Sequence, residues 1–316
     1  MQEKFSEVHA PSVSQVLTFS SVREQNAPIG HQIDIDGRGI WTHRSGQGDP
    51  AVVFVPGAGS FGLDFALVQE RVAEFATAIL YDRAGTGWSQ DAALPRSATE
   101  VTDELRAVLR ATAGPIPYVL VGHSLGGAYV QRYAQRFPDE VAALVLLDPA
   151  HEDWNLYMPE DLQLRAEDMQ VVELPPEYIA SVREQYTPLF SAFPKEIRDH
   201  LINRHLDPER LMTGMQEGLN FMDVLEDLRA GGSRPDVPLI LLNGTAIDPS
   251  QTQFRSKEQL QAQINASRRL YASVVDAAPQ GEYRDIPEAT HASIPLTSPA
   301  AVADAVKDVL TRHRRR

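Results

Sequence analysis

The feature that most constrains this chain is an abrupt change of pattern within residues 118–138, YVLVGHSLGGAYVQRYAQRFP. An apolar run long enough for a short buried strand meets Gly-His-Ser-Leu-Gly, and a helical pattern then continues to Pro138. Ser124 therefore stands where a strand turns directly into a helix. So tight a turn strains the serine backbone and tolerates only small residues two positions away, here Gly122 and Gly126. The pattern predicts a serine hydroxyl exposed above the carboxyl edge of a sheet, beside a helix N-terminus.

Short apolar runs alternate with helical patterns on both sides of this turn. Such alternation is typical of a mostly parallel sheet with helices on both faces, and predicts the α/β class. Asp36-Gly37 favours a hairpin turn, and Ser97 with Glu100 has capping-box spacing for a helix that ends near residue 113. Strands are expected at 31–35, 39–43, 51–55, 77–81, 118–121, 141–147, 237–242 and 283–286, and further helices near 61–75, 257–275 and 299–313.

The alternation stops between residues 151 and 235. This segment has no clear strand pattern, and it holds 17 acidic and 8 basic side chains and five of the six methionines. We expect a core of residues 31–150 and 236–316, with a helical cap at 151–235 inserted after the sixth strand and an N-terminal arm at 1–30. The methionines fill gaps between helices on one interpretation. On the other they form an adaptable wall over a binding site, which makes Met158, Met215 and Met222 candidate substrate contacts.

Composition excludes several classes of function. The net charge of −14 argues against a nucleic-acid surface, which needs a basic face. The absence of cysteine excludes disulfides, thiolate metal sites and a cysteine nucleophile. Neither a membrane-spanning run nor a signal-peptide pattern is visible, so a cytoplasmic location is expected. The histidines lack the spacing of a metal site, and the glycine-rich segment at 81–87 lacks the spacing and lysine of a phosphate-binding loop. We therefore expect no metal and no cofactor.

A serine nucleophile needs a base, and the base needs a carboxylate that orients it. Asp248 follows the strand expected at 237–242, and His291 follows the strand expected at 283–286. Both residues are thus expected in loops at the carboxyl ends of strands, in the chain order serine, aspartate, histidine. Asp148 also follows a strand and is an alternative acid.

The segments VVFVPGAGS, LYDRAGTGWS, LVGHSLGG, LVLLDPAH, LLNGTAID and IPEATHAS follow one another in this chain. In these segments the chain resembles the α/β-hydrolase superfamily, in its capped branch with a serine nucleophile. The resemblance covers about residues 31–150 and 236–313 and implies the α/β-hydrolase fold. It implies Ser124 as nucleophile, His291 as base and Asp248 as orienting acid.

The resemblance also implies an oxyanion hole. One donor is the N–H of Leu125, and the second comes from the loop after the third strand, where Ala58 is preferred to Gly59. Many relatives have His-Gly in this loop, whereas this chain has Pro56-Gly57. The segment 81–87 is expected to buttress the loop. Further candidate substrate contacts are Gly57, Gly59 and His151.

These expectations predict a serine hydrolase that cleaves an apolar carboxylic ester or a lactone through an acyl-enzyme. The same triad also serves amidases or peptidases, carbon–carbon bond hydrolases and cofactor-free perhydrolases. A receptor-like binding module with slow turnover is an alternative of another class. Haloalkane dehalogenases and epoxide hydrolases resemble the core but need a carboxylate nucleophile, and residue 124 is a serine. The partner expected is a small-molecule substrate.

Overall fold

A computed structural model describes residues 27–172 and 174–315 of the chain. Within these residues eight strands form one sheet in the order β1-β2-β4-β3-β5-β6-β7-β8. The pairs from β4 to β8 are parallel, and β2 pairs antiparallel with both β1 and β4. The expected mostly parallel sheet is confirmed. The strands are β1 (His31–Ile35), β2 (Arg38–Ser45), β3 (Val52–Val55), β4 (Ala78–Tyr81), β5 (Tyr118–His123), β6 (Val141–Leu147), β7 (Leu239–Gly244) and β8 (Gly281–Ile286).

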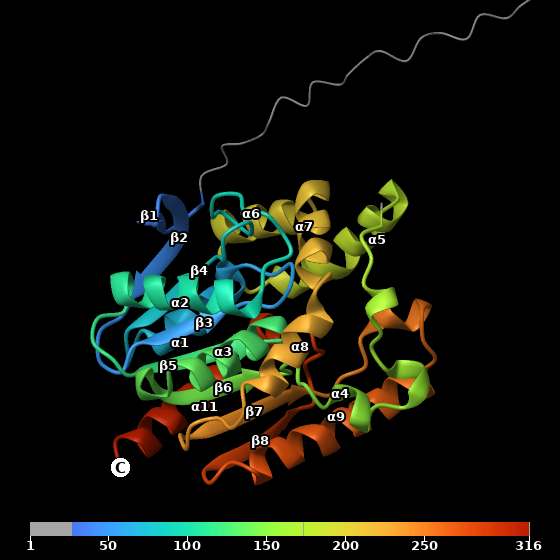
Figure 1. Cartoon of the computed structure of the whole chain (residues 1–316). Helices are drawn as coiled ribbons and strands as arrows, with labels where there is room; N and C mark the ends of the chain where they lie inside the picture. The colour runs from blue at the N-terminus through green and yellow to red at the C-terminus, as the bar shows by residue number, and fades with distance from the viewer. Residues whose placement is uncertain (1–26, 173, 316) are drawn as a thin grey trace, which may run out of the picture.

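Helices cover both faces of the sheet (Figure 1). The alternation of side chains along β3 divides the core, because neighbouring residues of a strand point to opposite faces. Val52 and Phe54 join one apolar cluster together with α1 (Ala66–Val72) and α11 (Pro299–His313). Val53 and Val55 join the other, with α2 (Ala98–Thr112), α3 (Leu125–Arg136) and α9 (Lys257–Asp276).

Local signals set the helix boundaries. Ser97 caps α2 by accepting the N–H of Glu100, whose side chain accepts the N–H of Ser97, so the expected capping box is confirmed.

The helix expected at 61–75 is instead the short 3₁₀ turn η1 (Gly62–Phe65) followed by α1. Both Asp64 carboxylate oxygens are hydrogen-bonded, one to the Phe61 N–H and one to His205 of a distant segment. The conformation of this turn therefore depends on tertiary contacts of Asp64 as well as on helix propensity.

The described residues between β6 and β7 contain helices and no strand. We call residues 148–238 the helical insertion. The longer elements of the insertion are α4 (Trp154–Tyr157), α5 (Pro176–Tyr186), η5 (Thr187–Phe190), α6 (Lys195–His205), α7 (Pro208–Gly218) and α8 (Phe221–Ala230). Figure 1 shows α5, α6 and α7 together at one end of the molecule, while α8 lies along α3 and α4 lies beside α9. Residues 1–26 of the expected arm lie outside the described residues.

No helix in the described part of the chain is both long enough and apolar enough to cross a membrane. The carboxyl ends of the central parallel strands β3, β5 and β6 lie next to one another. The residues that follow them therefore meet at one edge of the sheet, under the helical insertion.

Candidate active site

Ser124 lies between the last residue of β5 and the first residue of α3, as the sequence predicts. Its backbone is strained, with φ 52° and ψ −121°. A Cβ added to Gly122 would lie 2.6 Å from the Gly126 carbonyl oxygen, and one added to Gly126 would lie 2.1 Å from the Val55 carbonyl oxygen. The two glycines are therefore required by close backbone contacts around the serine.

His291 lies in the loop after β8, and its Nε2 atom is 3.1 Å from the Ser124 Oγ. The His291 carbonyl accepts a hydrogen bond from Nε2 of His123, at 2.8 Å. Burial and the neighbouring His291 lower the pKa of His123 to about 3, so its ring is neutral and acts as a fixed donor. His123 thus holds the backbone of the histidine that faces Ser124.

The carboxylate that faces His291 belongs to Asp148, which follows β6. Asp148 Oδ2 is 3.6 Å from His291 Nδ1, and the Asp148 side chain is 5% exposed while that of His291 is 56% exposed. The same oxygen accepts the Gly244 N–H at 3.1 Å. Burial raises the pKa of Asp148, while His291 and the Gly244 N–H oppose that rise. The separation exceeds a normal hydrogen bond, but catalytic contacts often tighten only with substrate bound.

The structure places Asp248 differently from the sequence-based expectation. Its Oδ1 atom accepts the N–H of Ser250 at 2.8 Å and the Ser250 hydroxyl at 2.7 Å. Asp248 thereby caps a short 3₁₀ turn, a common local use of an aspartate. The carboxylate paired with His291 is that of Asp148, which the sequence analysis kept only as the alternative.

Leu125 follows Ser124 in the chain, and Ala58 lines the same cavity as Ser124, so the N–H groups of both remain candidates for the oxyanion hole. Leu125 is the first residue of α3, so its N–H has no acceptor within the helix. The Gly59 N–H donates to Glu217 Oε2 at 3.0 Å, whereas no hydrogen bond of the Ala58 N–H is found in the described part of the chain. This difference favours Ala58 over Gly59 as the second free donor.

Arg83, in the glycine-rich segment after β4, buttresses the loop that carries Ala58. Its Nη1 donates to the Pro56 carbonyl at 2.5 Å, and its Nη2 donates to the Gly57 carbonyl at 2.8 Å. The expected contact between segment 81–87 and this loop is therefore confirmed.

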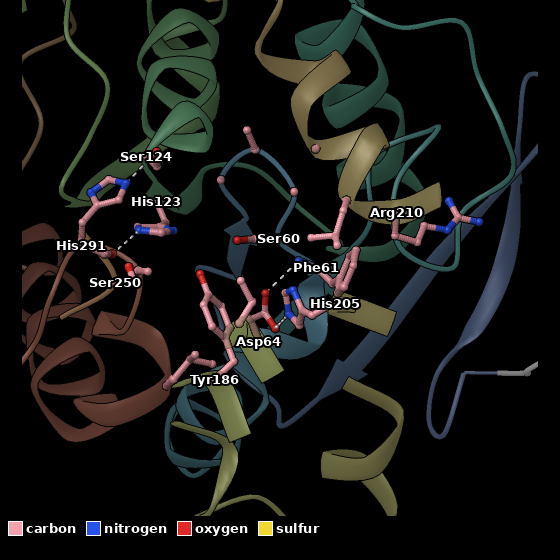
Figure 2. A pocket seen from close by; sticks show the side chains of 18 of the residues that line it. Ser60, Phe61, Asp64, His123, Ser124, Tyr186, His205, Arg210, Ser250 and His291 are labelled. Carbon is pink, nitrogen blue, oxygen red and sulfur yellow. Dashed lines mark hydrogen bonds and ion pairs between the residues drawn. The ribbon is translucent and has the colours of Figure 1, made fainter. Parts of the chain in front are cut away.

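A cavity of about 390 Å³ opens beside Ser124 and His291. Figure 2 shows these two residues on one side and Phe61, Asp64 and His205 on the other. His205 Nε2 lies 2.8 Å from Asp64 Oδ1. Most of the remaining wall is apolar. Of the candidate contacts from the sequence, Gly57, Ala58, Gly59 and Met215 line this cavity.

A second cavity of about 280 Å³ adjoins the first, and Asp148, Asp248 and Tyr271 contribute to its wall. His291 and Ser250 line both cavities. The histidine therefore contributes to the walls of both cavities, and Ser124 lines only the first of these two.

Three candidate contacts line neither of these two cavities. His151 is buried beside Glu152 and Arg234, and burial lowers its pKa to about 4. Met158 packs against Leu162 and Ala266. Met222 lies on α8, which packs on α3.

No sequence pattern assigned a role to Asp64, His205 or Glu217. Asp64 is separated by 141 positions from His205, and Glu217 by 158 positions from Gly59. No local pattern marks such side chains, because each one matters only through a partner brought close by the fold.

Within the described residues, no group of three or more His, Asp or Glu side chains is arranged to hold a metal ion.

Several known proteins resemble parts of this chain in sequence. A pimeloyl-[acyl-carrier protein] methyl ester esterase from Chromobacterium violaceum is 40% identical over 109 residues, 34% of this chain and 40% of that protein. This esterase and two other curated relatives are matched over only 37% to 52% of their own lengths.

Solved structures match over most of the chain. The epoxide hydrolase CorEH has a TM-score of 0.64 at 16% identity, covering 90% of this chain and 99% of its own. An esterase from Thermogutta terrifontis has a TM-score of 0.56 at 19% identity, covering 90% and 97%. At these identities the likeness concerns the fold alone. The model of the alpha/beta hydrolase family matches residues 52–305. With the sheet order and the strained serine turn, this match shows that the chain belongs to the alpha/beta hydrolase family.

Proposed function

We propose that the chain is a serine hydrolase that cleaves carboxylic esters through an acyl-enzyme. Ser124 is the nucleophile, His291 the general base and Asp148 the acid that orients His291. The observation that carries this proposal is the line of contacts from Ser124 Oγ to His291 Nε2, 3.1 Å, and from His291 Nδ1 to Asp148 Oδ2, 3.6 Å. The esterase among the relatives is consistent with this reaction.

The chemistry follows from the positions of these groups. His291 accepts the Ser124 proton through Nε2 as the Ser124 oxygen attacks the ester carbonyl carbon. The N–H groups of Ala58 and Leu125 donate hydrogen bonds to the oxyanion, each contributing about 3 kcal/mol to transition-state stabilisation. Protonated His291 then gives its proton to the leaving alcohol. The same histidine activates water, which releases the acid from Ser124.

The negative charge of Asp148 favours the imidazolium that forms during both steps. Burial makes this effect stronger, since Asp148 is only 5% exposed and opposite charges attract more strongly in a medium of low dielectric constant. The contact with Nδ1 also selects the tautomer in which Nε2 of His291 is free to accept the serine proton.

The substrate that fits best has an apolar acyl group. Phe65, Phe190, Leu206, Met215 and Leu296 line the cavity beside Ser124, so an alkyl or aryl chain would leave water on entering it. Several of these residues come from the helical insertion, and we infer that the insertion acts as the cap over the pocket.

The test is steady-state hydrolysis of chromogenic esters from acetyl to dodecanoyl. Turnover is expected with an optimum between these lengths, and Ser124→Ala and His291→Ala should each lose nearly all of it while keeping the native circular dichroism spectrum. Ser191→Ala, at an exposed serine of the insertion, is the matched control and should keep full activity. Retained turnover in Ser124→Ala would overturn the proposal. Amide and lactone analogues of the best acyl group then distinguish esterase, amidase and lactonase activity.

A further inference from the structure

Helix α7 of the insertion lies directly against the loop that carries Ala58. A Cβ added to Gly214 of α7 would lie 2.8 Å from the Gly59 Cα and 3.4 Å from the Gly59 nitrogen. In the other direction, a Cβ added to Gly59 would lie 3.2 Å from the Gly214 Cα. The backbones of the helix and the loop therefore touch with no side chain between them.

One helical turn after Gly214, the Glu217 side chain adds a polar tie to the same loop. Its Oε2 atom accepts the Gly59 N–H at 3.0 Å. Its Oε1 atom accepts Nε of Arg83 at 2.9 Å, and Oε2 accepts Nη2 of Arg83 at 3.1 Å. Because Arg83 also donates to the carbonyls of Pro56 and Gly57, the loop is held on both sides of Ala58.

The Arg83–Glu217 pair is buried, with side chains 2% and 5% exposed. Burial disfavours the charge of Arg83, but Glu217 outweighs it and raises the pKa of Arg83 above its ordinary value. Moving α7 away would leave a buried guanidinium without its carboxylate, which is strongly unfavourable. The contact between α7 and the loop is therefore a fixed part of the folded site.

We propose that Gly214 and Glu217 are positioning residues of the oxyanion hole, which together fix the direction of the Ala58 N–H. This inference rests on the proposed serine-hydrolase function. Glu217 takes up the Gly59 N–H and leaves the Ala58 N–H free, while the Gly214 contact sets how close α7 stands to the loop. An oxyanion donor works only within about 2.7–3.1 Å of the oxygen, so a shift of a few tenths of an ångström weakens transition-state binding.

The most informative variant is Gly214→Ala, because alanine favours the helix while its methyl group collides with Gly59. The matched control is Gly218→Ala on the same helix, where an added Cβ meets nothing within 4 Å. We expect the kcat of Gly214→Ala to fall about 10- to 100-fold with KM within about threefold, since the change acts on the transition state. Gly218→Ala should remain within twofold of wild type for both constants, on the order expected for an uninvolved position.

Gly214 also lines the cavity, so ester length separates positioning from steric exclusion. The loss of kcat should be the same for the acetyl ester as for the longest ester accepted. A rise in KM confined to long esters, or a kcat equal to that of Gly218→Ala, would overturn the inference.

Glu217 gives a second test. Glu217→Gln keeps an oxygen acceptor for the Gly59 N–H and should retain more kcat than Glu217→Ala. The control on the same helix is Glu209→Ala, at an exposed acidic residue. Equal activity of the two Glu217 variants would contradict a positioning role for its acceptor oxygen.

Labelling of Ser124 by a fluorophosphonate provides a readout that needs no known substrate. Wild-type protein should be labelled and Ser124→Ala should not, and Gly214→Ala should be labelled about tenfold or more slowly than Gly218→Ala. Equal labelling rates in the two glycine variants would overturn this inference while leaving the proposed function intact. Absence of labelling in the wild type would overturn both.

Discussion

At the level of single residues, Ser124 and Asp148 are held firmly by the fold, whereas the His291 side chain is open to solvent. Ser124 is fixed by its strained turn, and Asp148 is buried with one oxygen on the Gly244 N–H. His291 is more than half exposed, but its carbonyl is tied to His123. The His291 residue is therefore held through its backbone, while its imidazole remains accessible to solvent.

The two candidate acids can be separated by charge-neutral substitutions. Asp148→Asn should lower kcat by about 10⁴-fold, because an amide neither stabilises the imidazolium nor selects the correct tautomer. Asp248→Asn should keep kcat within about threefold, since its carboxylate serves Ser250 rather than His291. The comparison is made by steady-state kinetics at pH 8, and the opposite order of losses would restore Asp248 as the acid.

Ser124 and His291, whose Oγ and Nε2 atoms lie 3.1 Å apart, could be singled out from the sequence because each lies in a recognisable segment directly after a strand. The carboxylate that faces His291 could not, because Asp148 and Asp248 both follow strands, β6 and β7, that are neighbours in the sheet. Which carboxylate reaches the imidazole depends on the course of each loop after its strand. Sequence spacing does not specify that course.

The neutral state of His123 makes folding stability depend on pH. Its pKa is about 3 in the folded protein against 6.5 for an ordinary histidine, so the unfolded chain takes up the proton first as the pH falls. The contribution of neutral His123 is complete above pH 6.5 and is lost progressively toward about pH 3. The expected slope from this residue is about 1.4 kcal/mol per pH unit.

His123→Asn isolates this contribution, because asparagine does not titrate. Unfolding by urea is measured for both proteins between pH 7 and pH 4. The wild type should lose stability more steeply on acidification, so that the difference between the two proteins shrinks. Parallel pH dependences would show that His123 is not the buried neutral histidine described here.

At the scale of elements, the strands and the helix caps follow from local patterns, whereas the packing of the insertion does not. The apolar runs predict the eight strands to within a few residues, and the capping box of α2 is correct. The cavity wall depends instead on which face of α6 and α7 meets the core. Met215 faces the cavity and Met158 does not, although both are methionines of the same insertion.

The close packing of α3 on the sheet predicts that a methyl group at Gly126 destabilises the fold. Gly126→Ala places a methyl group 2.1 Å from the Val55 carbonyl oxygen and 2.4 Å from that of Pro56, in backbone that cannot rotate aside. The free energy of unfolding should fall by about 3 kcal/mol or more. Urea unfolding measures the loss, with Gly218→Ala as the helical glycine that has room for a methyl group. A loss no larger than that of Gly218→Ala would contradict the described packing.

At the scale of the whole molecule, the insertion and the sheet are joined by buried polar contacts. Arg83 after β4 binds Glu217 on α7, and Asp64 after β3 binds His205 on α6. Each contact joins segments that are more than 130 positions apart. These contacts attach α6 and α7, which contribute to the cavity wall, to the segments that follow β3 and β4.

Substitutions in the Arg83–Glu217 pair distinguish its effect on folding stability from its effect on activity. Arg83→Met should lower the free energy of unfolding by about 3–5 kcal/mol, because Glu217 is left as an unpaired buried charge. Adding Glu217→Met should recover most of that loss, since two packed apolar side chains can replace a buried pair. Ester hydrolysis should stay low in the double variant, because the Pro56–Gly59 loop has lost its hydrogen bonds. Urea unfolding measures the stability of each variant, and ester hydrolysis by the same samples measures its activity. A double variant with wild-type activity would contradict the predicted role of these hydrogen bonds in the Pro56–Gly59 loop.

Whether Ser124 forms an acyl-enzyme is tested most directly by the mass of the protein quenched by acid during turnover of a p-nitrophenyl ester. A fraction of molecules should be heavier by one acyl group, with that group on the peptide containing Ser124 and absent from Ser124→Ala. Hydrolysis that proceeds with no acylated protein, or with the acyl group on another residue, would contradict nucleophilic catalysis by Ser124.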